Sequence, residues 1–285
     1  GSEMCIRDSS IPIHETMSFE SLRNHLYTLP DFPDAIPYRT SYYARRWGFC
    51  LSQNQFDKLD KDALYEVFID SRLDEKGSMT VGEATLKGDS EKCVYLTSYI
   101  CHPSMANNEL SGPVVTIYLA KWILERKRRR YNYRIIFIPE TIGSITYLSK
   151  HLPEMKRRVR AGFNISCVGD DRTYSYVASR YGNTLADKVA KNVLSFHYPE
   201  YKQYSFLQRG SDERQYNAPG IDLPVCAVCR SKYGEYSEYH TSKDDMGMVS
   251  PSGLQGAYEV YHDMIEVLEY NHKYKVCLLY TSDAA

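Results

Sequence analysis

The sequence predicts an α/β fold, in which helices cover both faces of a central and largely parallel sheet. From about residue 91 onward, short β-branched and aromatic runs alternate with segments whose apolar residues recur at helical spacing. Such alternation is typical of parallel strands joined by crossover helices. The length of 285 residues also suits one sizeable α/β domain with an accessory module.

The individual elements follow from the same patterns. The first strand is the run 94–100, and apolar residues at helical spacing predict a helix over 110–125. The later elements are strands at 133–139, 162–168 and 223–228, and helices after Gly143, over 185–194 and from about 252 to 269.

The rest of the chain predicts a smaller unit and two foreign ends. Residues 11–90 hold short strand-like runs, among them 79–86, between Lys, Asp and Gly turns, which indicates a small β-rich part. Residues 1–10 and 276–285 resemble translated sequencing-adapter sequence. We therefore expect both natural termini to be missing and the α/β domain to occupy 91–275.

Composition argues against several classes of partner. The 35 basic and 36 acidic residues leave a net charge of -1, so we expect no bulk attraction to nucleic acid or to a membrane. No apolar run reaches the roughly 20 residues that span a bilayer. The Arg-rich run 121–134 favours a solvated helix end over a nucleic-acid site. The oligomeric state is left open.

The eight cysteines are spread through predicted strands and loops. This distribution is typical of reduced thiols and favours a cytoplasmic protein over a disulfide framework. Cys226 and Cys229 form a Cys-x-x-Cys pair, but they lie in an apolar strand-like run. A closed zinc site needs four ligands, and no second pair accompanies them.

Polar residues border the first connection between strand and helix. His102 follows the strand at its carboxyl end, where open α/β sheets bind their ligands. Asn107, Asn108 and Glu109 come just before the helix. Their side chains could cap that helix or turn toward the same crevice. The segment therefore indicates either an ordinary polar connection or part of a metal site.

Three later segments could contribute to the same site. Glu140 follows the next strand, where it could cap a helix or act as a general base beside a metal-bound water. Asp212, Glu213 and Arg214 could hold a charged substrate group or form a surface ion-pair network. His240 lies in a polar loop after the last strand. With His102 it could complete a zinc site, which needs about three protein ligands and an open position.

Five motifs occur in a characteristic order. They are Cys-His-Pro-Ser-x-Ala-Asn at 101–107, Pro-Glu-Thr-Ile-Gly-Ser at 139–144, Cys-Val-Gly-Asp-Asp at 167–171, Gly-Ser-Asp-Glu-Arg-Gln at 210–215 and Glu-Tyr-His-Thr-Ser at 238–242. Together they resemble the zinc aminopeptidase superfamily, which includes glutaminyl cyclases. The closer resemblance is to a bacterial aminopeptidase-like family linked to polysaccharide biosynthesis, and it extends from residue 11 to about 275.

The resemblance implies a three-layer α/β/α sandwich with a β-rich insertion. Members of the family begin with a further helical part and often end with a winged helix-turn-helix domain. Residues 11–90 would then be the remainder of the insertion.

The resemblance also implies roles for individual residues. His102 and His240 match metal-binding histidines, and Glu140 matches the general base. Three anionic ligands of two-metal enzymes fall on neutral residues, namely Asn108, Thr141 and Ser166. Because two divalent ions need anionic ligands, we expect one zinc at most.

The remaining ligands of that zinc are left open. An oxygen of Asn108 or Glu109 would join the two histidines, and the carboxylate is chemically the better zinc ligand. Asp170 or Asp171 could replace Ser166.

We therefore expect a zinc-dependent hydrolase of amide bonds in a small or peptide-like substrate, with Glu140 as general base and Asp212 or Glu213 orienting the substrate. The alternative is a catalytically degenerate module that binds a metal or a small ligand in a regulatory role. A cyclase-like acyl transfer is a third hypothesis.

Overall fold

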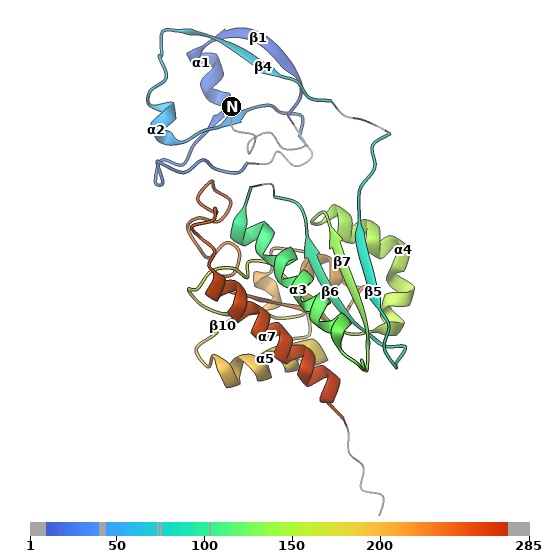
Figure 1. Cartoon of the computed structure of the whole chain (residues 1–285). Helices are drawn as coiled ribbons and strands as arrows, with labels where there is room; N and C mark the ends of the chain where they lie inside the picture. Colours follow the sequence, from blue (N-terminus) through green and yellow to red (C-terminus); the bar gives the residue numbers. More distant parts are fainter. Residues whose placement is uncertain (1–9, 40–43, 73, 75, 103, 273–285) are drawn as a thin grey trace, which may run out of the picture.

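The computed structural model describes residues 10–39, 44–72, 74, 76–102 and 104–272. Two parts are visible in Figure 1, a small N-terminal module that includes residues 10–39 and 44–72 and a larger α/β domain below it. The predicted foreign ends, 1–10 and 276–285, lie outside the described residues except for Ser10.

A seven-stranded sheet forms the middle of the domain. Its strand order is β10-β9-β11-β8-β6-β7-β5. Neighbouring strands run parallel except for the pairs β11 with β9 and β5 with β7, so the sheet is largely parallel, as predicted. The strands are β5 (Gly82–Leu86), β6 (Cys93–Tyr99), β7 (Asn132–Ile138), β8 (Val159–Asn164), β9 (Ser175–Val177), β10 (Lys202–Tyr204) and β11 (Val225–Cys229).

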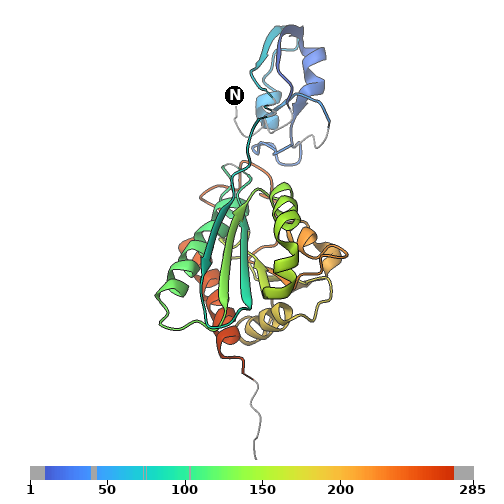
Figure 2. The ribbon, with the colours of Figure 1, turned by 90° about the vertical axis from the view of Figure 1, so that its right-hand side faces the viewer.

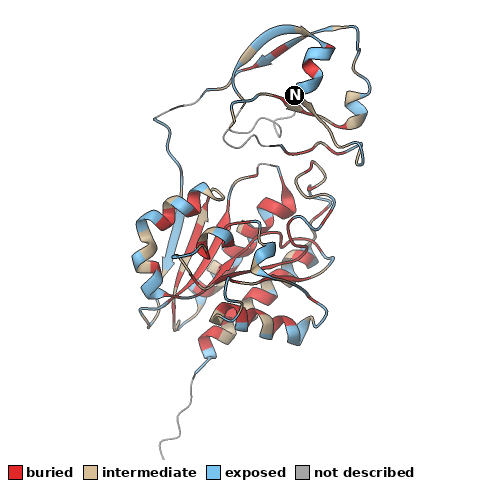
Figure 3. Ribbon diagram, turned by 180° about the vertical axis from the view of Figure 1, so that it is seen from behind, coloured by how far each residue is buried: buried red, intermediate tan, exposed pale blue. Residues whose placement is uncertain are grey.

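Helices cover both faces of this sheet. On one face, α3 (Ser111–Glu125), α5 (Leu185–His197) and α7 (Pro251–Tyr270) bury their apolar sides in one core. On the other face, α4 (Ile142–Arg158) and the short α6 (Glu213–Tyr216) pack in a second core. Figure 2 shows the strands between α3 and α4, and Figure 3 shows that the buried residues follow the sheet. The predicted three-layer sandwich is confirmed.

The spacing of apolar residues explains why α3 lies where it does. Val115, Leu119 and Ile123 recur every four residues and are at most 2% exposed. At its end, the Arg129 guanidinium donates hydrogen bonds to three carbonyl groups of the last turn and the residue after it. The predicted helix end therefore lies in the arginine-rich run, although the last residue of that run, Arg134, belongs to β7 and its side chain is only 12% exposed.

The N-terminal module is built from short elements. β1 (Ile13–Ser18) pairs antiparallel with β4 (Leu64–Ile69), and β2 (Leu26–Tyr27) pairs parallel with β3 (Phe49–Cys50). Two short helices and one 3₁₀ turn complete it. These are α1 (Phe19–Leu22), the turn Arg23–His25 and α2 (Gln53–Phe56).

One predicted strand belongs to a different unit. We assigned the run 79–86 to the β-rich part, but β5 pairs with β7 at the edge of the large sheet, from Gly82 opposite Phe137 to Leu86 opposite Tyr133. The partly polar sequence of β5 suited a small exposed module. The polar residues of β5 are explained instead by its position at the edge of the large sheet, where it pairs with β7 and no other described strand lies on its other side.

Cys226 and Cys229, the predicted Cys-x-x-Cys pair, are both buried in β11. Burial raises the pKa of both thiols well above the ordinary value. These thiols are therefore apolar core groups. Among the described residues, no helix has the length and apolar character that crossing a membrane requires.

Candidate metal centre

His102 lies just beyond the carboxyl end of β6 and is 2% exposed. A short π-helical turn, Ala106–Leu110, brings Glu109 beside it. The Glu109 carboxylate accepts hydrogen bonds from the backbone N–H groups of Cys101 (2.5 Å) and His102 (2.9 Å), and its Oε2 lies 3.5 Å from His102 Nδ1. Glu109 therefore fixes the backbone of the loop and places a carboxylate beside the imidazole.

Glu140 lies at the end of the neighbouring strand, β7. Its Oε2 is 4.0 Å from His102 Nε2, and its Oε1 accepts a hydrogen bond from Ser211 Oγ at 2.9 Å. The side chain is 17% exposed. Burial raises the pKa of this carboxyl, although the charge of His102 and the bond from Ser211 oppose the rise. A carboxylate with a raised pKa near an imidazole suits general-base chemistry.

The loop before α7 brings His240 to the same place. The ring centres of His102 and His240 are 4.8 Å apart, and Tyr239 stacks on His240 at 3.9 Å. Asn108 is also buried nearby, in the π-helical turn. Its Nδ2 donates to Tyr99 Oη at 2.8 Å, while its Oδ1 has no hydrogen-bond partner among the described residues.

Cys101 is the residue that our sequence analysis missed. One ligand atom each from Cys101, His102 and Glu140 lie within 4.8 Å of one another. Thiolate and imidazole are preferred zinc ligands, and tetrahedral zinc places its ligands roughly 3.5 Å apart. Small side-chain rotations would therefore bring the Cys101 thiolate and the His102 imidazole to the spacing of two zinc ligands, with the Glu140 carboxylate beside them. The position of Cys101 directly before His102 was the available signal.

The electrostatics of the centre favour a cation. Burial by itself lowers the pKa of His102, but contacts with Cys101, Glu109 and Glu140 outweigh this effect and raise the pKa to about 9. The surroundings thus stabilise positive charge at this position. The donor set and this charge balance both fit a bound zinc ion.

The three predicted substrate residues, Asp212, Glu213 and Arg214, lie in different environments. Asp212 is fully buried and accepts hydrogen bonds from Thr141 N (2.7 Å) and Ser144 Oγ (2.8 Å) at the start of α4. Burial and the charge of Glu140 raise its pKa to about 7. Arg214 is exposed.

Glu213 is also fully buried, and both of its carboxylate oxygens are engaged. They accept hydrogen bonds from Asn164 Nδ2, Tyr233 Oη and the backbone N–H groups of Gly210 and Ser211. The carboxylate therefore holds the loop that presents Ser211 to Glu140.

Asp170 and Asp171, the two carboxylates that could have replaced Ser166, accept hydrogen bonds from other residues. Asp170 accepts hydrogen bonds from Asn107 Nδ2 and from the backbone and hydroxyl of Ser231. Asp171 contacts Ser250 and Ser252 at the start of α7. A carboxylate that we did not predict, Asp244, accepts from the backbone N–H groups of Asn107 (2.6 Å) and Asn108 (3.0 Å) and anchors the π-helical turn.

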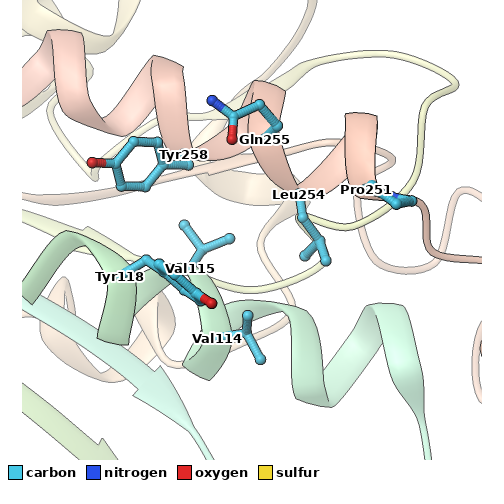
Figure 4. Close-up of a pocket in the computed structure, with 7 residues that line it drawn as sticks. All are labelled: Val114, Val115, Tyr118, Pro251, Leu254, Gln255 and Tyr258. Atoms are coloured by element: carbon cyan, nitrogen blue, oxygen red, sulfur yellow. The ribbon is translucent and has the colours of Figure 1, made fainter. Parts of the chain in front are cut away.

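A surface hollow between α3 and α7 lies apart from these residues (Figure 4). It is lined by Val114, Val115, Tyr118, Pro251, Leu254, Gln255 and Tyr258. None of the predicted site residues lines it.

Comparison with known proteins assigns the chain to a family. A family model described as a domain of unknown function (DUF4910) matches residues 8–271. The chain belongs to this family. A Clostridium acetobutylicum protein, provisionally named a polysaccharide biosynthesis protein with an aminopeptidase-like domain, is 43% identical over 265 residues, which are 93% of this chain and 60% of that protein.

Solved structures agree on the fold. A Clostridium acetobutylicum crystal structure, provisionally named a peptidase, matches with a TM-score of 0.86 at 43% identity and covers 91% of this chain and 60% of that one. The chain thus spans about 60% of the length of these relatives. The predicted resemblance to the bacterial aminopeptidase-like family is confirmed.

More distant structures show the fold alone. The zinc aminopeptidase BSAP of Bacillus subtilis matches with a TM-score of 0.55 at 21% identity, over 68% of this chain and 51% of that one. Glutaminyl cyclase of Porphyromonas gingivalis matches with a TM-score of 0.55 at 17% identity, over 67% and 77%. The aminopeptidase-like sandwich is therefore common to all of these proteins.

Proposed function

We propose that the chain carries the catalytic centre of a metal-dependent amide hydrolase that holds one zinc ion. The observation that carries this proposal is the position of Glu140, whose carboxylate faces His102 Nε2 at 4.0 Å where β6 and β7 end side by side. The substrate class would be a peptide or an amide-bearing sugar precursor. The names of the Clostridium acetobutylicum relatives favour that class.

The metal would be held by His102, His240 and Cys101, and its fourth position would stay open for water or substrate. A zinc ion in such a site polarises an amide carbonyl and acidifies a bound water. The thiolate would supply negative charge that the neutral residues at positions 108, 141 and 166 do not. Glu109 would orient His102 from its Nδ1 side, which is the usual task of a carboxylate behind a metal-bound imidazole.

Glu140 would take the proton from the attacking water. Ser211 holds one of its oxygens, so the other is directed toward His102. Because its pKa is raised, Glu140 is a stronger base than an exposed glutamate and can pass the proton on to the leaving amine. We assign Asp212 and Glu213 a supporting role beneath this base, and exposed Arg214 the contact with a charged substrate group.

A second candidate is a degenerate module that binds a metal or small ligand without hydrolysis. The neutral residues Asn108, Thr141 and Ser166 favour it, because each stands where the superfamily resemblance expects an anionic ligand. The two candidates differ in what the loss of Glu140 does.

The deciding experiment compares wild-type protein with Glu140→Gln. We measure zinc content by mass spectrometry and hydrolysis of leucine p-nitroanilide and of N-acetylated amino sugars. If Glu140 is the base, the variant keeps its zinc and loses on the order of 10² to 10⁴ in kcat. Unchanged kcat would refute catalysis by Glu140, and loss of zinc would make Glu140 a ligand instead.

Cys101→Ser tests the thiolate ligand separately. In the Co²⁺-loaded protein, a thiolate ligand gives a strong sulfur-to-metal absorption band in the near ultraviolet. We expect wild type to show this band and Cys101→Ser to lose both the band and most of its metal affinity. The buried thiol of Cys229 lies in β11, so Cys229→Ser is the matched control. A band that survives in Cys101→Ser would remove Cys101 from the site.

A further inference from the structure

A strap from the N-terminal module crosses the candidate metal centre. This strap is formed by residues 35–38, and it runs beside the loop that carries His240. Tyr38 N donates to His240 O (2.8 Å), Ser242 N donates to Ile36 O (2.9 Å), and Pro37 forms an antiparallel bridge with Thr241. Figures 1 and 2 show the module beyond the end of the sheet, on the side of this loop.

Tyr38 brings an aromatic ring against both imidazoles. Its ring centre lies 5.2 Å from that of His102 and 5.1 Å from that of His240. Tyr38 itself is only 7% exposed, and Ala35 at the start of the strap is fully buried. Backbone hydrogen bonds between Ile36 and Ser242 and between Tyr38 and His240 hold the strap against the domain.

The strap leaves one side of the centre more open. Tyr38 joins Tyr99, whose ring contacts His102, and Tyr239, whose ring stacks on His240. The His102 side chain is 3% exposed, whereas that of Glu140 is 17% exposed. A substrate would therefore approach the reacting groups past Glu140 and would meet a wall at Tyr38.

We propose that the strap is a wall of the substrate site and that Tyr38 is a specificity-determining residue, which restricts the site to the end of a substrate. This inference rests on the proposed amide hydrolysis. An amide near a chain end can reach Glu140 with only a small group directed at the wall. An internal amide needs chain on both sides, and the strap occupies one of those directions.

The first test asks whether the strap covers the histidines, and it needs neither metal nor substrate. Metal-free protein is treated with diethylpyrocarbonate, and mass spectrometry follows modification of His102 and His240, with partly exposed His197 as internal reference. We expect Tyr38→Ala to speed modification of both by roughly tenfold relative to His197, because aromatic contacts of this kind shift an opening equilibrium several-fold each. Tyr38→Phe keeps the ring and should behave as wild type.

Tyr65→Ala is the matched control, since Tyr65 lies in β4 of the same module and its ring contacts Phe19. If modification of His102 and His240 became equally faster in both alanine variants, the cause would be general loosening of the module. That result would overturn the proposal that the strap is a wall. Unchanged rates in Tyr38→Ala would overturn it as well.

The second test measures selectivity on the zinc-loaded chain. The probes are leucine p-nitroanilide, with a terminal amide, and an N-acetylated, C-amidated hexapeptide, with internal amides only. We expect Tyr38→Ala to raise kcat/KM for the hexapeptide relative to the anilide on the order of tenfold, mainly through KM. An unchanged ratio would overturn the specificity role even if the wall is present. If wild type and all variants hydrolyse neither probe, the proposed function and the selectivity both fail, while the modification rates still decide whether the strap covers the histidines.

Discussion

The buried carboxyl of Asp212 couples the candidate site to the stability of the fold. Its pKa of about 7 lies far above the ordinary aspartate value, because the group is buried and faces the charge of Glu140. The folded chain therefore binds this proton more tightly than the unfolded chain does. Below roughly pH 4 both states are protonated, so this stabilising contribution is fully present there and is lost as pH rises through about 7.

We expect Asp212→Asn to remove the loss of folding stability that wild type shows as pH rises. The amide oxygen can still accept from Thr141 N and Ser144, but it carries no charge to bury. At pH 8 the variant should be more stable than wild type by up to a few kcal/mol, and the two should converge near pH 4. Urea unfolding between pH 4 and 8 measures this, with exposed Asp245→Asn as control. If the unfolding free energy of Asp212→Asn fell with rising pH as steeply as that of wild type, the raised pKa of Asp212 would be contradicted.

At the scale of single elements, the turn that follows β7 positions the base. Thr141 has φ 62° and ψ -67°, and Ile142 N donates to Glu140 O at 2.7 Å. This is a γ-turn with positive φ, a rare and strained backbone for a residue with a Cβ. Asp212 holds the turn through Thr141 N. The strained turn at Thr141 therefore agrees with a backbone whose conformation positions the Glu140 carboxylate.

Thr141→Gly should therefore relieve the strain, whereas Thr141→Ala should not, because alanine keeps the Cβ. We expect the glycine variant to be about 1 kcal/mol more stable than the alanine variant, after allowance for the greater freedom of glycine in the unfolded chain. Chemical denaturation of the pair provides the measurement. Equal stability of the two variants would show that the turn stores no such strain.

The elements were largely predictable because their periodicity is local. The strand at 94–100 and the helix at 110–125 appear as β6 (Cys93–Tyr99) and α3 (Ser111–Glu125). The short strands β9 and β10 were missed, because three residues are too few to show a period. The π-helical turn at Ala106–Leu110 was missed too. Its geometry depends on Asp244, which is more than 130 residues away in sequence.

At the scale of the whole molecule, the charge of the candidate centre would limit the number of metal ions that one chain binds. The residues around it supply fewer anionic ligands than two divalent ions need. We expect wild-type protein to hold one zinc per chain by mass spectrometry after dialysis. The triple variant N108D/T141E/S166D, which restores the three anionic positions, should bind more than one. Two tightly held zinc ions in wild type would refute this account.

The candidate site was predicted in part. His102, His240 and Glu140 do converge, because they follow strands or loops at the same end of one sheet. Their roles in metal binding and catalysis stay predictions. Asp212, Glu213 and Arg214 are adjacent in sequence but face three different environments, since α6 turns each side chain in its own direction. Adjacency alone could not show this.

The α/β fold and the order of its elements could be predicted because apolar periodicity is a local property of the chain. The same local patterns predicted which chemically able side chains stand at strand ends. Only the tertiary structure brought Cys101 within reach of Glu140, buried Asp212 beneath the base and laid Tyr38 across the two histidines. These contacts join segments that are tens to more than two hundred residues apart, and their geometry depends on how the layers pack.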